Sequence, residues 1–272
     1  MIIKKIALTA SRSVYYLRFY IEIAFGLPKL KVINKRARND PAYPGLAVAS
    51  IAVGKKYLSW SLAMIETLRT NGRFYGPVYV FTDQPEFYAD VNNVIAVEVP
   101  SSTDFMTIQN YKSMLANPIP YDHILYLDVD VMIGRPIKLL LEEIKDFIDK
   151  YSIFIFEDRG FSGDKYHAGV FLANRSLASD FMFRWRRSIQ CLESKDDQAA
   201  LQYVLKPDEF YVMPEKHLMF FTPKLLENKE VCTFIHITFR GRQEWYGAEI
   251  IMDYLKNVLN VTHLPSGSKM SA

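Results

Sequence analysis

Two aspartates one residue apart, Asp128 and Asp130, stand where one short apolar run ends and a second one begins. The two runs cover residues 124–127 and 131–133. Apolar runs of this length are typical of buried strands in a parallel sheet, and such sheets carry their chemistry at the carboxyl ends of the strands. Two carboxylates that lie this close repel each other unless a cation lies between them. Their oxygens suit Mg²⁺ or Mn²⁺.

A divalent ion with few protein ligands completes its coordination shell with other oxygens, and phosphate groups supply them. The sequence therefore predicts a site for a metal-bound diphosphate, as a nucleotide-sugar enzyme needs. The alternative interpretation is a strand end with two solvated carboxylates, because Asp-x-Asp is a common pattern by itself. The apolar runs on both sides of the pair favour the metal site.

The composition is typical of a globular α/β protein with a sizeable core. The chain has 272 residues, of which 50% are hydrophobic, and this length suits one large domain or one domain with an arm. Its two cysteines, Cys191 and Cys232, lie in apolar surroundings without metal-ligand spacing, which fits buried thiols in a reducing compartment. No run of about 18 uncharged apolar residues occurs, so we expect no ordinary transmembrane helix.

Charge is distributed unevenly along the chain. Residues 1–38 contain nine basic residues and one acidic residue, whereas the whole chain carries a formal charge of +3. Within this arm, residues 13–27 place Tyr15, Phe19 and Ile23 on one face of an expected helix. Such a helix can lie on an anionic membrane surface, and it can equally pack on the protein or on a second subunit. We expect a cytoplasmic protein, with peripheral attachment to a membrane as a hypothesis, and no nucleic acid partner.

Strand-like and helix-like segments alternate in the first half of the chain. Besides the aspartate strand, we expect strands at 46–53, 78–82, 94–99 and 152–156, and helices at 57–69, 105–116 and 137–148. This alternation predicts a mostly parallel central sheet with helices on both faces.

The second half of the chain is less regular. Strands are expected at 166–174, 210–213 and 231–237, and helices at 176–191, 196–205 and 248–258. Ser176 is expected to cap the first of these helices, and the tail at 263–272 is expected to be flexible.

The order of these segments resembles a glycosyltransferase of the GT-A fold, with the nearest likeness to family 8, the glycogenin and galactosyltransferase group. The resemblance covers residues 46–242, and it rests on the order and spacing of five pieces of sequence taken together. Its pieces are the opening strand with Tyr57, Lys112 sixteen residues before Asp128, Leu125-Tyr-Leu-Asp-Val-Asp130, His167-Ala-Gly-Val-Phe-Leu with the later Asp197-Gln198, and His236. It implies one Rossmann-like α/β domain at 46–262, preceded at 1–45 by the basic amphipathic arm and a linker.

The resemblance also implies an activity and the residues that perform it. A sugar would pass from a nucleotide donor, a UDP-sugar in the first instance, to a glycan or lipid-linked acceptor, as in polysaccharide biosynthesis. The metal, Mn²⁺ or Mg²⁺, would be held by Asp128, Asp130 and His236, and it would neutralise the departing diphosphate. The donor would be bound by Ala49, Ser50, Tyr57, Lys112, Asp128, Arg240 and Arg242. The sugar and the acceptor would be faced by Asp197 and Gln198, and His167 and Asp164 are further candidate catalytic residues.

Two departures from the family pattern make the fold assignment firmer than the family assignment. Family 8 has Asn at the position of His167, and it follows its late His with a Gly-x-x-Lys-Pro-Trp type segment, whereas residues 237–242 here are Ile-Thr-Phe-Arg-Gly-Arg. The stereochemical outcome stays open, with Asp158, Asp164 and Asp197 as candidate bases.

Three other classes fit parts of the pattern. A haloacid-dehalogenase-type phosphatase would use Asp128 as nucleophile and residues 196–197 as a second metal pair, but that pair is expected to open a helix. A sugar nucleotidyltransferase needs a Gly-rich basic loop, of which residues 54–56 are a thin version. A non-catalytic binding module would make both aspartates incidental.

Overall fold

The computed structural model describes residues 30–33, 38–102, 105–158, 163–191, 196–237 and 247–265. The helix expected at 13–27 and most of the tail expected at 263–272 lie outside these ranges, so both stay predictions.

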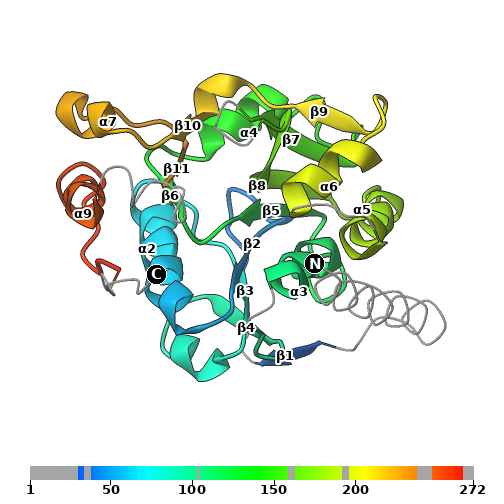
Figure 1. Ribbon diagram of the computed structural model, residues 1–272, viewed down its shortest axis with the longest axis horizontal. Helices are drawn as coiled ribbons and strands as arrows, with labels where there is room; N and C mark the ends of the chain where they lie inside the picture. The colour runs from blue at the N-terminus through cyan, green and yellow to red at the C-terminus, as the bar shows by residue number, and fades with distance from the viewer. Residues whose placement is uncertain are drawn as a thin grey trace, which may run out of the picture.

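An eight-stranded sheet forms the centre of the molecule, in the order β1-β4-β3-β2-β5-β8-β7-β9 (Figure 1). Strands β4, β3, β2 and β5 pair in parallel, as do β7 and β9. Strand β8 runs antiparallel to both of its neighbours, and β1 runs antiparallel to β4. The strands are β1 (Lys31–Ile33), β2 (Leu46–Ala52), β3 (Val78–Thr82), β4 (Val94–Glu98), β5 (His123–Leu127), β7 (Ile153–Glu157), β8 (Tyr166–Asn174) and β9 (Phe210–Val212).

Helices cover both faces of this sheet, as the alternating pattern predicted (Figure 1). They are α2 (Lys55–Thr70), α3 (Phe105–Asn110), α4 (Lys138–Ile144), α5 (Ser179–Cys191), α6 (Asp197–Val204), α7 (Pro223–Asn228) and α9 (Ala248–Asn257). Short 3₁₀ turns lie at η1 (Pro85–Tyr88), η2 (Tyr111–Met114) and η3 (Glu215–His217).

Strand β2 is buried along its whole length because alternate residues face two separate cores. Leu46 and Val48 face the core beneath α2 and α9. Ala47 and Ala49 face the core beneath α5 and α6. The two-sided burial explains why the sequence of this strand is apolar throughout rather than alternating.

A second, three-stranded sheet was not predicted in this form. It has the order β10-β11-β6, with β6 at Val131–Ile133, β10 at Leu218–Phe220 and β11 at Phe234–His236. Strand β11 runs antiparallel to β6, and this pairing places His236 opposite Val131. The strand expected at 231–237 is therefore shorter than predicted, and it brings a late segment of the chain beside the aspartate strand.

The helix starts follow local capping chemistry. Helix α6 begins where predicted, because Oδ1 of Asp196 accepts a hydrogen bond from the backbone N–H of Ala199 at 2.8 Å. Helix α5 begins at Ser179 rather than after Ser176. The Ser176 hydroxyl donates instead to Oδ1 of Asn174 at 2.8 Å, so the prediction of Ser176 as the cap was wrong.

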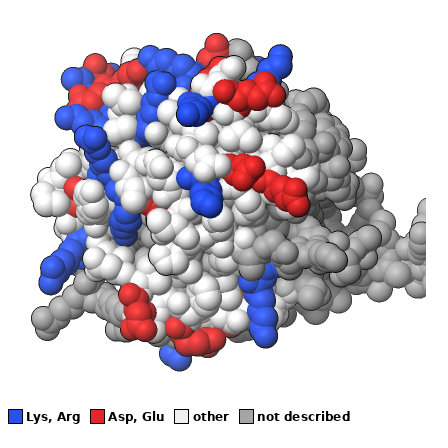
Figure 2. All heavy atoms as spheres, turned by 90° about the vertical axis from the view of Figure 1, so that its left-hand side faces the viewer, with Lys and Arg blue, Asp and Glu red and all other residues white. Residues whose placement is uncertain are grey.

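The face that carries α7 and α9 bears charges of both signs (Figure 2). Basic and acidic side chains lie together along its upper part, and a broader uncharged area lies below them. This mixture differs from the dense basic surface that nucleic acid binding favours. Among the described helices, none is long and apolar enough to cross a membrane.

Candidate functional site

A pocket of about 320 Å³ lies where the carboxyl ends of β2 and β5 meet the second sheet. One side of it is apolar, and the other side is polar and includes several carboxylates. The apolar side is formed by Ile51, Val53, Tyr57, Trp60, Ile108 and Val129. The polar side includes Lys112, Asp128, Asp130, His167, Asp197, Gln198 and His236.

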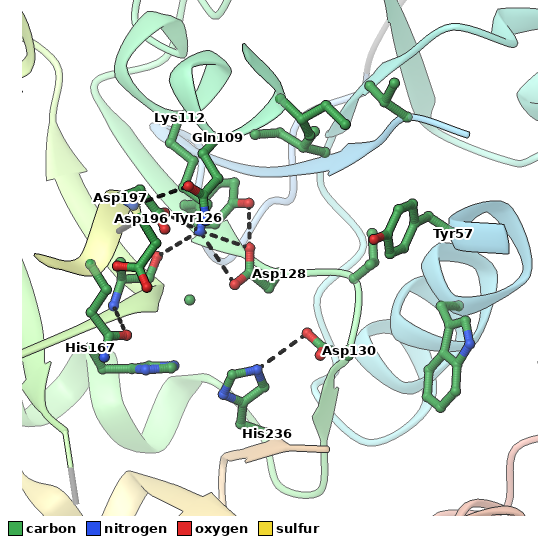
Figure 3. A pocket seen from close by; sticks show the side chains of 18 residues that line it. Tyr57, Gln109, Lys112, Tyr126, Asp128, Asp130, His167, Asp196, Asp197 and His236 are labelled. Carbon is green, nitrogen blue, oxygen red and sulfur yellow. Dashed lines mark hydrogen bonds and ion pairs between the residues drawn. The ribbon is translucent and has the colours of Figure 1, made fainter. Parts of the chain in front are cut away.

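Asp128 directly follows β5, as the sequence predicted. Its backbone N–H donates to the carbonyl of Gly169 on β8 at 2.8 Å. Its Oδ1 accepts a hydrogen bond from the Tyr126 hydroxyl at 2.6 Å and lies 3.0 Å from Nζ of Lys112 (Figure 3). Burial, with a further contribution from the nearby Asp128 carboxylate, raises the pKa of Tyr126 well above its ordinary value. The phenol therefore keeps its proton and acts as the donor.

Asp130 and His236 are brought together by the pairing of β6 with β11. The backbone N–H of Ile237 donates to the carbonyl of Asp130 at 2.9 Å. Nε2 of His236 lies 3.3 Å from Oδ1 of Asp130 (Figure 3). Burial alone would lower the pKa of His236, and the Asp130 carboxylate outweighs that effect and raises the pKa.

Asp128, Asp130 and His236 each offer one ligand atom, and these atoms all lie within 4.8 Å of one another. Two carboxylates and one imidazole form a donor set that suits Mn²⁺. The two carboxylates without the imidazole would also suit Mg²⁺. The three residues predicted as metal ligands therefore lie together, although His236 is more than a hundred positions from the two aspartates in the sequence.

Lys112 reaches the pocket from η2 and is almost completely enclosed. Its Nζ lies 2.6 Å from Oδ2 of Asp197 and 3.0 Å from Oδ1 of Asp128. Burial would lower the pKa of Lys112, but the two carboxylates outweigh it and raise the pKa. Lys112 lines the pocket, and its predicted role toward a donor stays a prediction. Its charge, however, is already balanced by two carboxylates, so it offers a bound diphosphate less positive charge than an unpaired lysine would.

His167 lies on β8 beside the group of three ligands. Its ring centroid is 4.8 Å from that of His236 and 5.3 Å from that of Phe220. Its Nε2 is buried and has no hydrogen-bond partner among the residues that the structure describes. Burial, together with the charges of His236 and Lys112, holds the pKa of His167 well below its ordinary value. The pocket therefore contains a neutral imidazole with one unsatisfied nitrogen.

Gln198 joins the pocket wall to two carboxylates behind it. Its Nε2 donates to Oδ2 of Asp158 at 2.6 Å and to Oδ2 of Asp164 at 3.4 Å. Its Oε1 accepts from the backbone N–H of Ala168 at 3.2 Å. Asp164 was predicted as a candidate catalytic residue, but it does not line this pocket. Its contact with Gln198 connects it to the pocket wall.

Two of the predicted donor-binding residues do not line the pocket. Ala49 and Ser50 are completely buried within β2. Ile51 and Val53 line the pocket in their place, because it lies at the carboxyl end of the strand. Arg240 and Arg242 lie outside the described residues, so their assignment stays a prediction.

Sequence reasoning missed two residues that shape the site. Tyr126 was treated only as part of an apolar strand, although its hydroxyl contacts Asp128. Gly169 was treated only as part of a motif. A Cβ atom at Gly169 would lie 2.7 Å from Oδ2 of Asp128 and 2.8 Å from Nε2 of His167. The absence of a side chain therefore keeps open the space between these two groups.

Comparison with models of protein families finds no match, and comparison with curated protein sequences finds none either. Several solved structures are similar in fold. The glycosyltransferase GlyE of Streptococcus pneumoniae TIGR4 has a TM-score of 0.55 and 17% identity, over 79% of this chain and 62% of GlyE. The present chain thus spans less than two thirds of the length of GlyE.

Two further structures are similar over almost their whole length. The galactosyltransferase LgtC, in complex with donor and acceptor sugar analogues, has a TM-score of 0.54 and 13% identity, over 81% of this chain and 97% of LgtC. A glycosyltransferase involved in glycosylation of the major capsid of PBCV-1 has a TM-score of 0.53 and 15% identity, over 77% of this chain and 100% of that one. At these identities the likeness shows the fold, and the chain has the GT-A α/β fold of these glycosyltransferases.

Proposed function

We propose that the protein is a metal-dependent glycosyltransferase that moves a sugar from a nucleoside diphosphate, in the first instance a UDP-sugar, to a glycan or lipid-linked acceptor. The observation that carries this proposal is the group of Asp128, Asp130 and His236, with ligand atoms within 4.8 Å of one another in the pocket of a GT-A fold. The similarity to LgtC, which was solved with donor and acceptor sugar analogues, supports the proposed use of a sugar donor.

The charges of the pocket support a divalent ion. The three carboxylates of Asp128, Asp130 and Asp197 outnumber the cations Lys112 and protonated His236, so an excess of negative charge remains. Without a bound cation, these three carboxylates would repel a diphosphate. When bound, a divalent ion supplies Lewis acidity toward the diphosphate oxygens and neutralises the charge that the leaving group gains.

The two sides of the pocket suit the two ends of a nucleotide sugar. Tyr57, near the start of α2, lies across the pocket from Asp197 and His167 (Figure 3). Together with Ile51, Val53 and Trp60 it forms an apolar wall that suits a base and a ribose. The diphosphate would then lie over Asp128 and Asp130.

The sugar would lie beside His167 and Gln198. The unsatisfied Nε2 of His167 can form a hydrogen bond with a hydroxyl group, because a neutral imidazole nitrogen can donate or accept. Asp197 is engaged by Lys112 at 2.6 Å, and for that reason we assign it to holding Lys112 rather than to acting as a base. In the transfer, the bond between the sugar anomeric carbon and the diphosphate oxygen breaks, and the nucleoside diphosphate leaves with the bonding electron pair. The oxygen of the acceptor hydroxyl forms the new bond to that carbon, and the hydroxyl proton passes to water or to the released diphosphate.

Calorimetric titration with UDP, with and without Mn²⁺, tests this function. The wild type is expected to bind UDP in a Mn²⁺-dependent manner, and Asp130→Ala is expected to abolish the dependence. Asp146→Ala is the matched control, because Asp146 is exposed and does not line the pocket. Failure to bind UDP would require GDP and other nucleotides to be titrated. Hydrolysis of a simple phosphate ester without any nucleotide binding would instead favour the phosphatase, although Asp196 caps a helix rather than ending a strand.

We also propose that the basic arm places the enzyme on the cytoplasmic face of a membrane, where a lipid-linked acceptor would be available. The charge excess of residues 1–38 supports this. Because β1 pairs with β4, the arm is best truncated before Lys31. Deletion of residues 1–29 is expected to abolish binding to vesicles that contain anionic lipid. Unchanged binding would contradict the membrane role while leaving the transferase proposal intact.

A further inference from the structure

The two carboxylate oxygens of Asp128 have unequal surroundings. Oδ1 accepts the Tyr126 hydroxyl at 2.6 Å and lies 3.0 Å from Nζ of Lys112. Oδ2 lies 3.3 Å from the same ammonium and borders the space that Gly169 keeps open. Figure 3 shows the oxygen bonded to Tyr126 on one side and the other oxygen turned toward the side of His236. One oxygen is therefore held inward, and the other is presented to the pocket.

The Tyr126 hydroxyl is held in place by the packing of its ring. Tyr126 and Phe171 are register partners on the antiparallel strands β5 and β8, and their rings stack with centroids 4.9 Å apart. Nζ of Lys112 lies 5.0 Å from the centre of the Tyr126 ring. Because Tyr126 is almost fully buried, its ring has little freedom to turn. The hydroxyl therefore meets Asp128 from a fixed direction.

Lys112 alone would not select one oxygen of Asp128, because its Nζ lies at similar distances from both, 3.0 Å and 3.3 Å. Asp197 draws the same ammonium closer, to 2.6 Å. The short hydrogen bond from Tyr126 is thus the contact that distinguishes Oδ1 from Oδ2.

We propose that Tyr126 is a positioning residue that determines which oxygen of Asp128 binds the divalent ion, by holding Oδ1 and leaving Oδ2 to the metal. The inference rests on the proposed function, since it takes Asp128 as a metal ligand. A carboxylate that is already oriented loses less rotational freedom when the ion binds. Groups that orient a ligand in this way typically contribute about 10- to 100-fold to metal affinity.

Mn²⁺ binding by the full chain, followed through the electron paramagnetic resonance signal of free Mn²⁺, tests the inference. Tyr126→Phe keeps the stacked ring and removes only the hydroxyl. We expect it to raise the Kd for Mn²⁺ about 10- to 100-fold. Tyr88→Phe is the matched control, because Tyr88 is equally buried, its hydroxyl lies 2.6 Å from Oγ of Ser61, and it does not line the pocket. We expect the control to leave the Kd for Mn²⁺ unchanged.

Each other outcome contradicts the inference. An unchanged Kd in Tyr126→Phe would overturn it while leaving the proposed function intact. If both variants weakened Mn²⁺ binding equally, the effect would be due to a general loss of stability, which thermal unfolding of both proteins would show. If Tyr126→Phe does not fold, Phe171→Leu loosens the ring and keeps the hydroxyl, and an unchanged Kd there would overturn the inference as well. A wild type that binds no Mn²⁺, with or without UDP, would overturn both proposals.

Discussion

Lys112 and Asp197 form an ion pair in the interior of the molecule, with 2.6 Å between Nζ and Oδ2 and with both side chains almost fully buried. The pair joins η2 to the first turn of α6 and lies directly behind Asp128. A buried charge is costly unless it is paired, so each partner depends on the other. The same ion pair therefore links the stability of the fold to the arrangement of the proposed metal site.

Lys112→Met is expected to lower the free energy of unfolding at neutral pH by roughly 3 kcal/mol, because it leaves Asp197 buried without its cation. Urea denaturation measures the change. In the double variant Lys112→Met/Asp197→Leu, part of this loss should be recovered, since no unpaired charge remains at position 197. If Lys112→Met were as stable as the wild type, the ion pair would contribute little to the free energy of unfolding.

Gly169→Ala is expected to weaken Mn²⁺-dependent UDP binding by about 10-fold or more, as is typical when the support of a metal ligand is disturbed. The new Cβ would lie 2.7 Å from Oδ2 of Asp128, so the carboxylate must move. Gly45→Ala is the control, because its Cβ would meet a carboxylate oxygen of Asp122 at 3.1 Å, away from the pocket. Titration calorimetry of both variants checks this, and equal affinities for UDP would contradict it.

His236→Gln is expected to reduce the preference of the site for Mn²⁺ over Mg²⁺. An imidazole nitrogen suits Mn²⁺ better than Mg²⁺, whereas the amide oxygen of Gln does not favour Mn²⁺ in this way. The ratio of the Kd for Mg²⁺ to the Kd for Mn²⁺ should therefore fall in the variant. His263→Gln, at an exposed position, should leave the ratio unchanged. A constant ratio in His236→Gln would argue that His236 does not bind the ion.

Stability is expected to decrease as the pH falls below about 6.5, the ordinary pKa of histidine. Burial lowers the pKa of His217, and the nearby Glu143 carboxylate only partly offsets this. The unfolded chain therefore takes up a proton that the folded protein does not, so the contribution of neutral His217 is present above that pH and is lost below it. In His217→Gln, urea denaturation at a series of pH values should show a shallower decrease. A decrease as steep as that of the wild type would contradict this assignment.

Local patterns in the sequence predicted much of the fold. Most strands and helices of the first half were correctly placed, because apolar runs and helical spacing report burial directly. Strand β1, in the expected arm, was not predicted, and the helix expected at 105–116 is α-helical only as far as Asn110. The positions of Asp128 at a strand end and of Asp196 at a helix start were also predicted, since each depends on a few neighbouring residues. The antiparallel direction of β8 was not predicted, because a strand buried on both faces has the same apolar pattern in either direction.

The sequence by itself determined the two aspartates, their place after a buried strand and the kind of ion they suit. Tertiary structure decided which other groups meet them. His236 reaches Asp130 only through the pairing of β11 with β6, and Lys112 reaches Asp128 and Asp197 only through the packing of η2 against α6 and β8. Contacts between distant segments depend on strand register and helix packing, and no local pattern of residues encodes these.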